Sequence, residues 1–216
     1  MECSVSFDFK ARYFKSVEIT PDTRQVWYVL HGYGQLARYF IRKFDAFADK
    51  NICVIAPEGL SHFYLEDVES RTRTGNNRVG ASWMTRENRS LDMDNYLTLL
   101  NTIHEKETSN TQLPIVLFGF SQGCATITRW ALQGLIPFQK LILWAGAFPP
   151  DMNFENGTRI LAEKKVVGVF GNQDPFVTNE RWEEMRRLND RLKIIPEIIR
   201  FEGGHEIHTP TLMQLI

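Results

Sequence analysis

Apolar runs and helical repeats alternate along most of this chain. The apolar runs cover residues 26–30, 52–56, 115–118, 141–144, 166–170 and 198–201. Short continuous runs of this kind are typical of strands that a parallel sheet buries on both faces. Between them, apolar residues recur at helical spacing, as in Leu36, Phe40 and Phe44, or Tyr96, Leu100 and Ile103. The alternation predicts an α/β fold, with a mostly parallel central sheet and helices on both faces.

Further elements are expected outside these runs. Val5, Phe7 and Phe9 alternate with polar residues, and a second extended segment ends near Ile19, so the pattern predicts an N-terminal antiparallel hairpin. Helices are also predicted over residues 122–133, from about 178 onward, and briefly after Pro210. Residues from about 60 to 89 show no clear periodicity, which indicates an irregular insertion or loop. We expect a single domain spanning residues 1–216.

Composition narrows the classes of function. The 216 residues carry a formal net charge of −1, so no broad electrostatic field attracts nucleic acid or an anionic membrane. Three cysteines, an odd and sparse set, argue against a disulfide framework. The first residues lack a secretory pattern, and no run of about 18 apolar residues predicts a membrane span. These features favour a cytoplasmic protein without stable membrane insertion, and they leave its oligomeric state open.

A glycine-flanked serine directly follows the apolar run 115–118. Residues 119–123 read Gly-Phe-Ser-Gln-Gly, which matches G-x-S-x-G, and a helical pattern begins at Gln122. A strand before and a helix after this motif are the context of a nucleophile elbow. There a strained turn exposes the serine hydroxyl, and small neighbours let the strand and the helix approach each other. The pattern predicts Ser121 as a nucleophile.

A serine needs a general base, and the fold just predicted supplies its catalytic residues in the chain order serine, acid, histidine. Only two histidines follow Ser121. His205 comes directly after the run 198–201, where a loop-borne base is expected, whereas His208 is expected to begin the last helix. Position therefore favours His205.

The orienting acid is expected after the preceding strand. Asp174 follows the run 166–170 in a Gly-Asn-Gln-Asp-Pro turn. An aspartate before a proline also occurs simply as a turn or helix cap. Its order in the chain and its place opposite His205 favour the catalytic role. Glu180 and Asp190 are weaker candidates, because they fall within a predicted helix.

Acyl transfer also needs N–H donors that stabilise the negative charge on the carbonyl oxygen. The backbone N–H of Gln122, the residue after the nucleophile, is one expected donor. The second is expected in the loop after the run 26–30, which reads His-Gly-Tyr-Gly-Gln over residues 31–35. Its glycines permit close backbone approach, and Tyr33 is the predicted donor. By itself, such a loop could also be an ordinary glycine-rich turn.

These segments together resemble a known family. The His-Gly-Tyr-Gly at 31–34, the motif at 119–123, the Asp174 turn and the Gly-Gly-His at 203–205 are similar to the phospholipase/carboxylesterase group of small α/β-hydrolases. That group includes acyl-protein thioesterase-like enzymes, and the resemblance extends from about Val26 to His208. It implies the α/β-hydrolase fold and hydrolysis of carboxylic esters without a cofactor or metal.

By the same resemblance, Ser121, Asp174 and His205 form a catalytic triad, with Tyr33 and Gln122 as oxyanion donors. The chain departs from the family at Cys124, where a glycine is frequent, and over residues 60–89, which do not match the acyl-binding loops of the thioesterase branch. The departures favour a general small-ester hydrolase over an enzyme that deacylates proteins.

Substrate-binding residues are expected in the segment 60–89. Phe63, Trp83 and Met84 are predicted to wall an acyl pocket, although they could equally pin a long loop to the core. The same region holds five arginines, at positions 71, 73, 78, 86 and 89. They could attract a carboxylate or phosphate, but acidic neighbours favour a solvated loop.

The expected function is that of a serine esterase, a hydrolase that cleaves small-molecule esters with small or medium acyl chains through an acyl-enzyme. Two alternatives remain open at this stage. One is a thioesterase or peptidase that uses the same triad, and the other is a non-catalytic binding module on the same fold.

Overall fold

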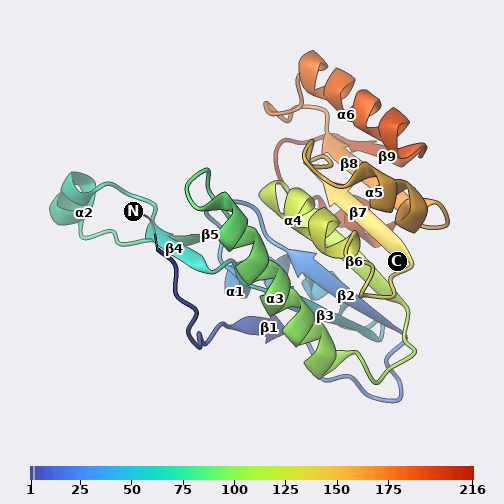
Figure 1. Ribbon diagram of the computed structural model, residues 1–216, viewed down its shortest axis with the longest axis horizontal. Helices are drawn as coiled ribbons and strands as arrows, with labels where there is room; N and C mark the ends of the chain where they lie inside the picture. Colours follow the sequence, from blue (N-terminus) through green and yellow to red (C-terminus); the bar gives the residue numbers. More distant parts are fainter. Residues whose placement is uncertain (2) are drawn as a thin grey trace.

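The computed structural model describes residues 1 and 3–216, and a seven-stranded sheet lies at its centre (Figure 1). The strand order is β1-β3-β2-β6-β7-β8-β9, with β1 antiparallel to β3 and the other neighbours parallel. The strands of this sheet are β1 (Tyr13–Lys15), β2 (Gln25–Leu30), β3 (Ile52–Pro57), β6 (Ile115–Phe120), β7 (Lys140–Trp144), β8 (Lys165–Gly171) and β9 (Glu197–Phe201).

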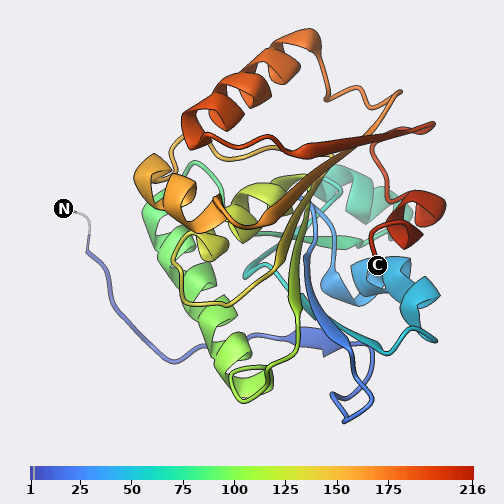
Figure 2. The same ribbon diagram turned by 90° about the vertical axis from the view of Figure 1, so that its right-hand side faces the viewer.

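Helices cover both faces of the sheet, as its edge-on view shows (Figure 2). One face carries α3 (Arg89–Glu107), α4 (Gln122–Ala131), α5 (Phe154–Leu161) and α6 (Asn179–Leu192). The other carries α1 (Ala37–Phe40), the 3₁₀ helix η1 (Ile41–Phe47) and α7 (Thr209–Met213). This is the doubly covered, mostly parallel sheet that the sequence predicted.

Alternation along the strands divides the core into two layers. Val26, Tyr28 and Leu30 face the layer of α3 and α4, whereas Trp27 and Val29 face the layer of η1 and α7. All five residues are fully buried. Both faces of β2 are covered, so every position from Val26 to Leu30 must be apolar, which explains the continuous run in the sequence.

The predicted apolar runs all form strands, but the last one is not buried on both faces. β9 lies at the edge of the sheet, and Ile198 is 45% exposed. Periodicity does not distinguish an edge strand from a central one, because the position depends on the order of strands. The parallel arrangement brings the carboxyl ends of β2, β3, β6, β7, β8 and β9 to one rim of the sheet.

The predicted N-terminal hairpin is wrong. Residues 3–12 form no strand, and Val5, Phe7 and Phe9 are 86%, 75% and 60% exposed. β1 pairs with β3 instead. The alternating pattern had the right period for a strand, but the fold offers it no neighbouring strand to pair with.

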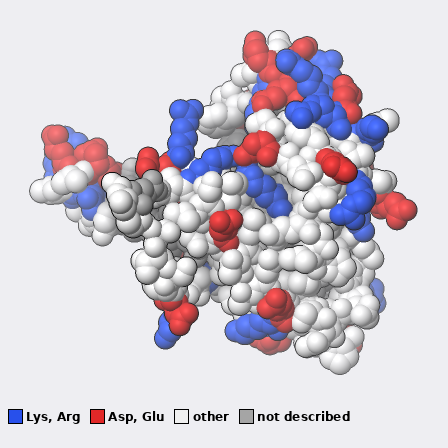
Figure 3. All heavy atoms as spheres, in the orientation of Figure 1, with Lys and Arg blue, Asp and Glu red and all other residues white. Residues whose placement is uncertain are grey.

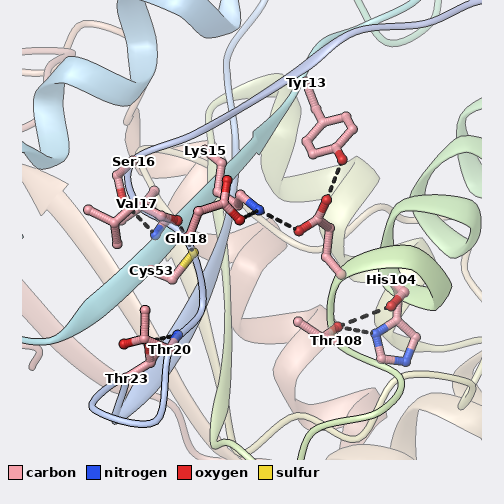
Figure 4. A network of polar contacts seen from close by, with 12 residues as sticks. Tyr13, Lys15, Ser16, Val17, Glu18, Thr20, Thr23, Cys53, His104 and Thr108 are labelled. Atoms are coloured by element: carbon pink, nitrogen blue, oxygen red, sulfur yellow. Dashed lines mark hydrogen bonds and ion pairs between the residues drawn. The ribbon is translucent and has the colours of Figure 1, made fainter.

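A polar network fixes β1 to the end of α3 (Figure 4). The Tyr13 hydroxyl and the Lys15 ammonium both donate to the carboxylate of Glu107. Burial by itself would raise the pKa of Glu107, but these hydrogen bonds outweigh it and lower the pKa. Nearby, Thr108 joins the His104 ring to the Tyr28 hydroxyl, with contacts of 2.6 and 2.8 Å. Side-chain contacts with Glu107 therefore add to the pairing of β1 with β3.

The segment predicted to be irregular contains regular elements. β4 (Ser61–Tyr64) and β5 (Val79–Ser82) pair as an antiparallel hairpin that carries α2 (Val68–Thr74) at its tip. Asp67 caps α2 by accepting from the Ser70 N–H at 2.8 Å, and Gly75 ends it in the left-handed conformation. These elements are too short for periodicity to be visible. The hairpin extends from the main body, with α2 farthest out (Figure 1).

Replacement of Phe118 tests the aromatic core between the sheet and the layer of η1 and α7. Phe118 is fully buried on β6 and its ring packs against Trp27, Phe44 and Trp144. We expect Phe118→Ala to lower the free energy of unfolding by about 3–5 kcal/mol in urea titrations, because it opens a cavity. Phe7→Ala, which removes an exposed ring, is the matched control and should change the value by less than about 0.5 kcal/mol. Equal effects of the two changes would contradict this description of the core.

Candidate active site

Ser121 lies between the end of β6 and the start of α4 in a strained backbone conformation. Its φ and ψ are 53° and −117°, a combination that L-residues rarely adopt. The Ser121 N–H donates to the Trp144 carbonyl of the neighbouring β7 at 2.9 Å. A strained residue of this kind costs on the order of 1–3 kcal/mol and persists only where its surroundings enforce it.

The glycines of the motif provide that enforcement by allowing backbones to touch. A Cβ on Gly123 would lie 2.3 Å from the Leu30 carbonyl oxygen of β2. A Cβ on Gly119 would lie 2.5 Å from the Gly123 carbonyl oxygen. Because neither position has room for a side chain, α4 begins in direct contact with β2 and β6, and the turn at Ser121 is correspondingly sharp.

His205 and Asp174 form a close pair. The Nδ1 atom of His205 lies 2.7 Å from Oδ2 of Asp174. The other carboxylate oxygen, Oδ1, accepts from the Phe176 N–H at 2.9 Å. The Asp174 side chain is fully buried, while that of His205 is 22% exposed. This geometry holds the ring by Nδ1 and leaves Nε2 as its unpaired nitrogen.

The two loops that carry this pair are clamped together by their backbones. Asp174 follows β8 and His205 follows β9. The Gln173 N–H donates to the Gly203 carbonyl at 2.9 Å, and a Cβ on Gly171 would lie 2.4 Å from that same oxygen. The aspartate and the histidine are therefore placed by backbone contacts between adjacent strands.

The ring of His205 is also enclosed by aromatic side chains. Its centroid lies 4.9 Å from that of Phe120 and 4.8 Å from that of Phe176. Ser121 and His205 line the same cavity, of about 440 Å³. His208, the alternative base, is elsewhere: its ring stacks on Phe201 and contacts the Thr211 hydroxyl at 2.8 Å.

Of the predicted oxyanion donors, Gln122 directly follows the serine in the chain, and Tyr33 belongs to the loop after β2. In the loop after β2, the Gly32 N–H donates to the Gln35 side chain and the Gly34 N–H to the Ala81 carbonyl. Among the described residues, the Tyr33 N–H has no acceptor, nor does the N–H of Gln122. A Cβ on Gly32 would lie 3.2 Å from Cβ of Ser121, so the loop touches the elbow.

The Gln122 side chain has a separate structural role. Its Oε1 accepts from the Trp83 N–H at 3.2 Å, and its Nε2 donates to the Met84 carbonyl at 2.9 Å. These bonds join the first turn of α4 to the segment after β5. The sequence assigned a role to the backbone of Gln122 and gave no sign of this side-chain function.

The buried ring of His31 contacts the backbone of the glycine-rich loop. It is fully buried, with Nδ1 donating to the Gly32 carbonyl at 2.7 Å and Nε2 accepting from the Gly59 N–H at 3.0 Å. Burial lowers the pKa of His31 to about 4, although the hydrogen bond to Gly32 acts in the opposite direction. His31 is therefore neutral near pH 7 and connects the loops that follow β2 and β3.

The residues predicted to wall the substrate pocket do not line this cavity in the described part of the chain. Trp83 is 1% exposed and donates its indole N–H to the His31 carbonyl at 2.8 Å. Phe63 stacks on the Tyr33 ring at 5.0 Å. Met84 is not part of the lining, but its sulfur contacts Arg89 and Arg129, which are. Trp83 belongs to the core, which corrects the prediction that it walls the pocket.

The apolar walls come instead from the loop after β7, from the end of β8 and the loop that follows it, and from α6. They include Phe148, Phe170, Phe176, Val177 and Met185. The rule that active sites lie at the carboxyl ends of parallel strands could have drawn attention to the first two loops. Met185 could not have been found in this way, because only tertiary packing brings α6 to the site.

The described residues offer neither a metal centre nor a membrane-spanning helix. No group of three or more histidine, cysteine, aspartate or glutamate side chains there is arranged to hold a metal ion. Within the same residues, no helix has both the length and the apolar character needed to cross a bilayer.

The doubly covered parallel sheet, the strained serine after β6, and an aspartate and histidine after β8 and β9 define the class of α/β-hydrolases. Comparison with known families agrees with this class. A family model described as "Serine hydrolase (FSH1)" matches residues 24–214, so the chain belongs to that family of serine hydrolases. The predicted relationship to serine hydrolases of this fold is confirmed, whereas a search of curated protein sequences gave no match.

Solved structures share the fold at low sequence identity. Acyl-protein thioesterase 2 from Zea mays superposes with a TM-score of 0.67 at 15% identity, covering 95% of this chain and 96% of its own. Esterase PE8 gives 0.65 at 19% identity, covering 96% and 100%. A phospholipase/carboxylesterase from Dyadobacter fermentans DSM 18053 gives 0.63 at 17% identity, covering 98% and 97%. At these identities the likeness shows the fold.

The buried His31 gives a pH-dependent stability. Its pKa is about 4 in the folded state and about 6.5 in an unfolded chain, so between these values only the unfolded state binds the proton. Stability from this residue is complete above about pH 6.5 and is lost as the pH falls toward 4. Between pH 7.5 and 5, we expect the wild type to lose about 2 kcal/mol more unfolding free energy than His31→Gln, measured in urea. Equal losses in the two proteins would contradict this role.

Proposed function

We propose that this serine hydrolase cleaves carboxylic esters with small or medium acyl chains, using Ser121, His205 and Asp174. The observation that carries the proposal is the cavity shared by Ser121 and His205, behind which Asp174 holds the histidine at 2.7 Å. The three side chains occur in the chain order of this fold and each follows a different parallel strand.

In the first half of the reaction, Nε2 of His205 takes the proton of the Ser121 hydroxyl as Oγ bonds to the ester carbonyl carbon. The carbonyl electron pair moves onto the oxygen, where the N–H groups of Tyr33 and Gln122 receive the negative charge. When the carbonyl re-forms, the bond to the alcohol breaks, and His205 returns the proton to the departing oxygen. Asp174 keeps the imidazole in the required tautomer and stabilises its charged form.

In the second half, water replaces the alcohol. His205 removes a proton from the water as its oxygen attacks the acyl carbon, and the proton then returns to Oγ of Ser121 as the acid leaves. No other reagent is consumed, so the chain's own residues complete the cycle without a cofactor.

The size and walls of the cavity support small substrates. A volume of about 440 Å³ lies within the usual range for small-molecule sites, and aromatic and aliphatic residues form much of its lining. An oxygen ester is the proposed substrate, and thioesters and peptide amides are the alternatives for the same triad. Rates on matched oxygen esters, thioesters and anilides of one acyl group discriminate between them, with the oxygen ester expected to react fastest.

A cytoplasmic location stays a prediction.

Replacement of the nucleophile is the first test. We expect Ser121→Ala to lower kcat for p-nitrophenyl butyrate by about 10⁶-fold, in effect to the assay background, because no acyl-enzyme can form. The same variant should resist labelling by a fluorophosphonate probe. Ser109→Ala, which removes an exposed hydroxyl just after α3, is the matched control and should retain activity and labelling. Wild-type protein that neither hydrolyses esters nor reacts with the probe would refute the proposal.

The orienting aspartate is tested by an isosteric change. Asp174→Asn keeps the shape of the side chain but favours the wrong tautomer of His205, and we expect kcat to fall by about 10⁴-fold. Asp190→Asn and Glu180→Gln, which alter the weaker acid candidates, should leave kcat within about twofold of wild type. If Asp190→Asn or Glu180→Gln proved the more damaging, the assignment of Asp174 would be overturned.

A further inference from the structure

The charged side chains that line the cavity are positive. Arg89, Arg129 and Arg181 line the cavity with Ser121 and His205, and no aspartate or glutamate does so among the described residues. Two acidic partners of these arginines, Asp151 and Glu184, lie outside the lining. A molecule in the cavity therefore meets guanidinium groups directly.

Arg129 is placed by the helix that begins at the nucleophile. Gln122, Ala125 and Arg129 all line the cavity, and their spacing of three and four residues puts them on one face of α4. At 1.5 Å per residue, Arg129 lies about 10 Å along the helix axis from Gln122. Its side chain, which is 10% exposed, therefore lies at the far end of the cavity face from the reacting centre.

Two of the arginines share a single carboxylate. Asp151, in the loop between β7 and α5, accepts from Nη2 of Arg129 at 2.7 Å and also from Nη2 of Arg89. Burial by itself would raise the pKa of Asp151, but these two hydrogen bonds outweigh it and lower the pKa to about 2. The three side chains therefore keep a net charge of +1. Figure 3 shows Lys and Arg atoms gathered with a few Asp and Glu atoms on the face of the molecule that α3 and α4 cover.

The remaining donors of Arg129 are weakly satisfied. Its Nη1 lies 3.5 Å from the Tyr96 hydroxyl and 3.7 Å from the Met84 sulfur, contacts that are long or made to a poor acceptor. Guanidinium groups bind carboxylates and phosphates through paired N–H donors. Weakly satisfied donors and a net positive charge thus coincide at one place in the cavity wall.

We infer that Arg129 and Arg89 form an anion-binding subsite, so that the preferred substrates are esters with a carboxylate or phosphate at a distance from the scissile bond. This inference rests on the proposed esterase function and names its substrate class. The anion can belong to the acyl part or to the alcohol part of the ester, since both contain atoms that enter the cavity. A purely structural brace between α3, α4 and the β7–α5 loop is the competing explanation.

The test compares substrates that differ only in charge. On the acyl side, the pair is the 4-nitrophenyl half-ester of suberic acid and the same compound with its free carboxylate methylated. On the alcohol side, the pair is 4-(2-carboxyethyl)phenyl hexanoate and its methyl ester, in which two methylene groups keep the reactivity of the leaving phenol nearly the same in both members. For each pair, the ratio of kcat/KM for the anionic to the neutral member measures the preference. In the wild type we expect a ratio of about 10 or more in one pair, which identifies the side that carries the anion.

Three variants make the test specific. Arg129→Gln and Arg89→Gln should each lower the ratio by about tenfold, as the loss of one charge-assisted hydrogen bond implies, while the neutral ester is affected little. Asp151→Asn should raise the ratio severalfold, because it releases both guanidinium groups. If the three side chains have only a structural role, all three changes should lower kcat/KM for the anionic and the neutral ester by the same factor and leave the ratio unchanged. Arg159→Gln, at an exposed position on α5, is the matched control.

The outcomes separate this inference from the esterase proposal. The wild type could hydrolyse the neutral esters in a Ser121-dependent way while the anionic-to-neutral ratio of kcat/KM stays near 1 in both pairs. That result would overturn the anion subsite and leave the esterase proposal intact. A wild-type ratio that neither arginine variant changes would overturn it too. Binding of suberate to Ser121→Ala, measured by calorimetry and lost in the double variant with Arg129→Gln, would support it without any turnover.

Discussion

Direct backbone contact between the start of α4 and the strands beneath it is the constraint on which the site depends. Gly119 and Gly123 leave no room for a side chain, since an added Cβ would approach backbone oxygens to 2.5 and 2.3 Å. This contact makes the turn at Ser121 sharp and keeps its backbone in a strained conformation. The loop that carries Tyr33 touches the same turn, since a Cβ on Gly32 would lie 3.2 Å from Cβ of Ser121. The predicted nucleophile Ser121 and the predicted oxyanion donor Gln122 thus depend on one packing arrangement.

Much of this arrangement could be predicted because it depends on local pattern and on one topological rule. The continuous apolar runs indicated the parallel strands, and parallel strands end at one rim. Ser121, Asp174 and His205 each follow such a run, so their convergence could be expected from chain order alone. Their catalytic roles stay predictions until variants are measured.

Features that depend on tertiary contacts were not accessible in the same way. Trp83 looked like a pocket residue, but its indole N–H is bound to the His31 carbonyl in the core. The alternation of Val5, Phe7 and Phe9 had the period of a strand, yet no neighbouring strand exists for it. The sharing of Asp151 by Arg89 and Arg129 joins positions 62 and 22 residues apart, which no local pattern reveals.

Cys124, three residues after Ser121, has a consequence for how this protein responds to its chemical surroundings. Cys124 is fully buried, its sulfur lies 3.0 Å from the Gly119 carbonyl oxygen, and burial raises the pKa of its thiol. Cys3, in contrast, is exposed. Alkylating agents and peroxide attack accessible thiolates, so they would modify Cys3 and leave Cys124 intact. Oxidising conditions should therefore leave the surroundings of Ser121 unmodified, although a thiol lies within one helical turn of it.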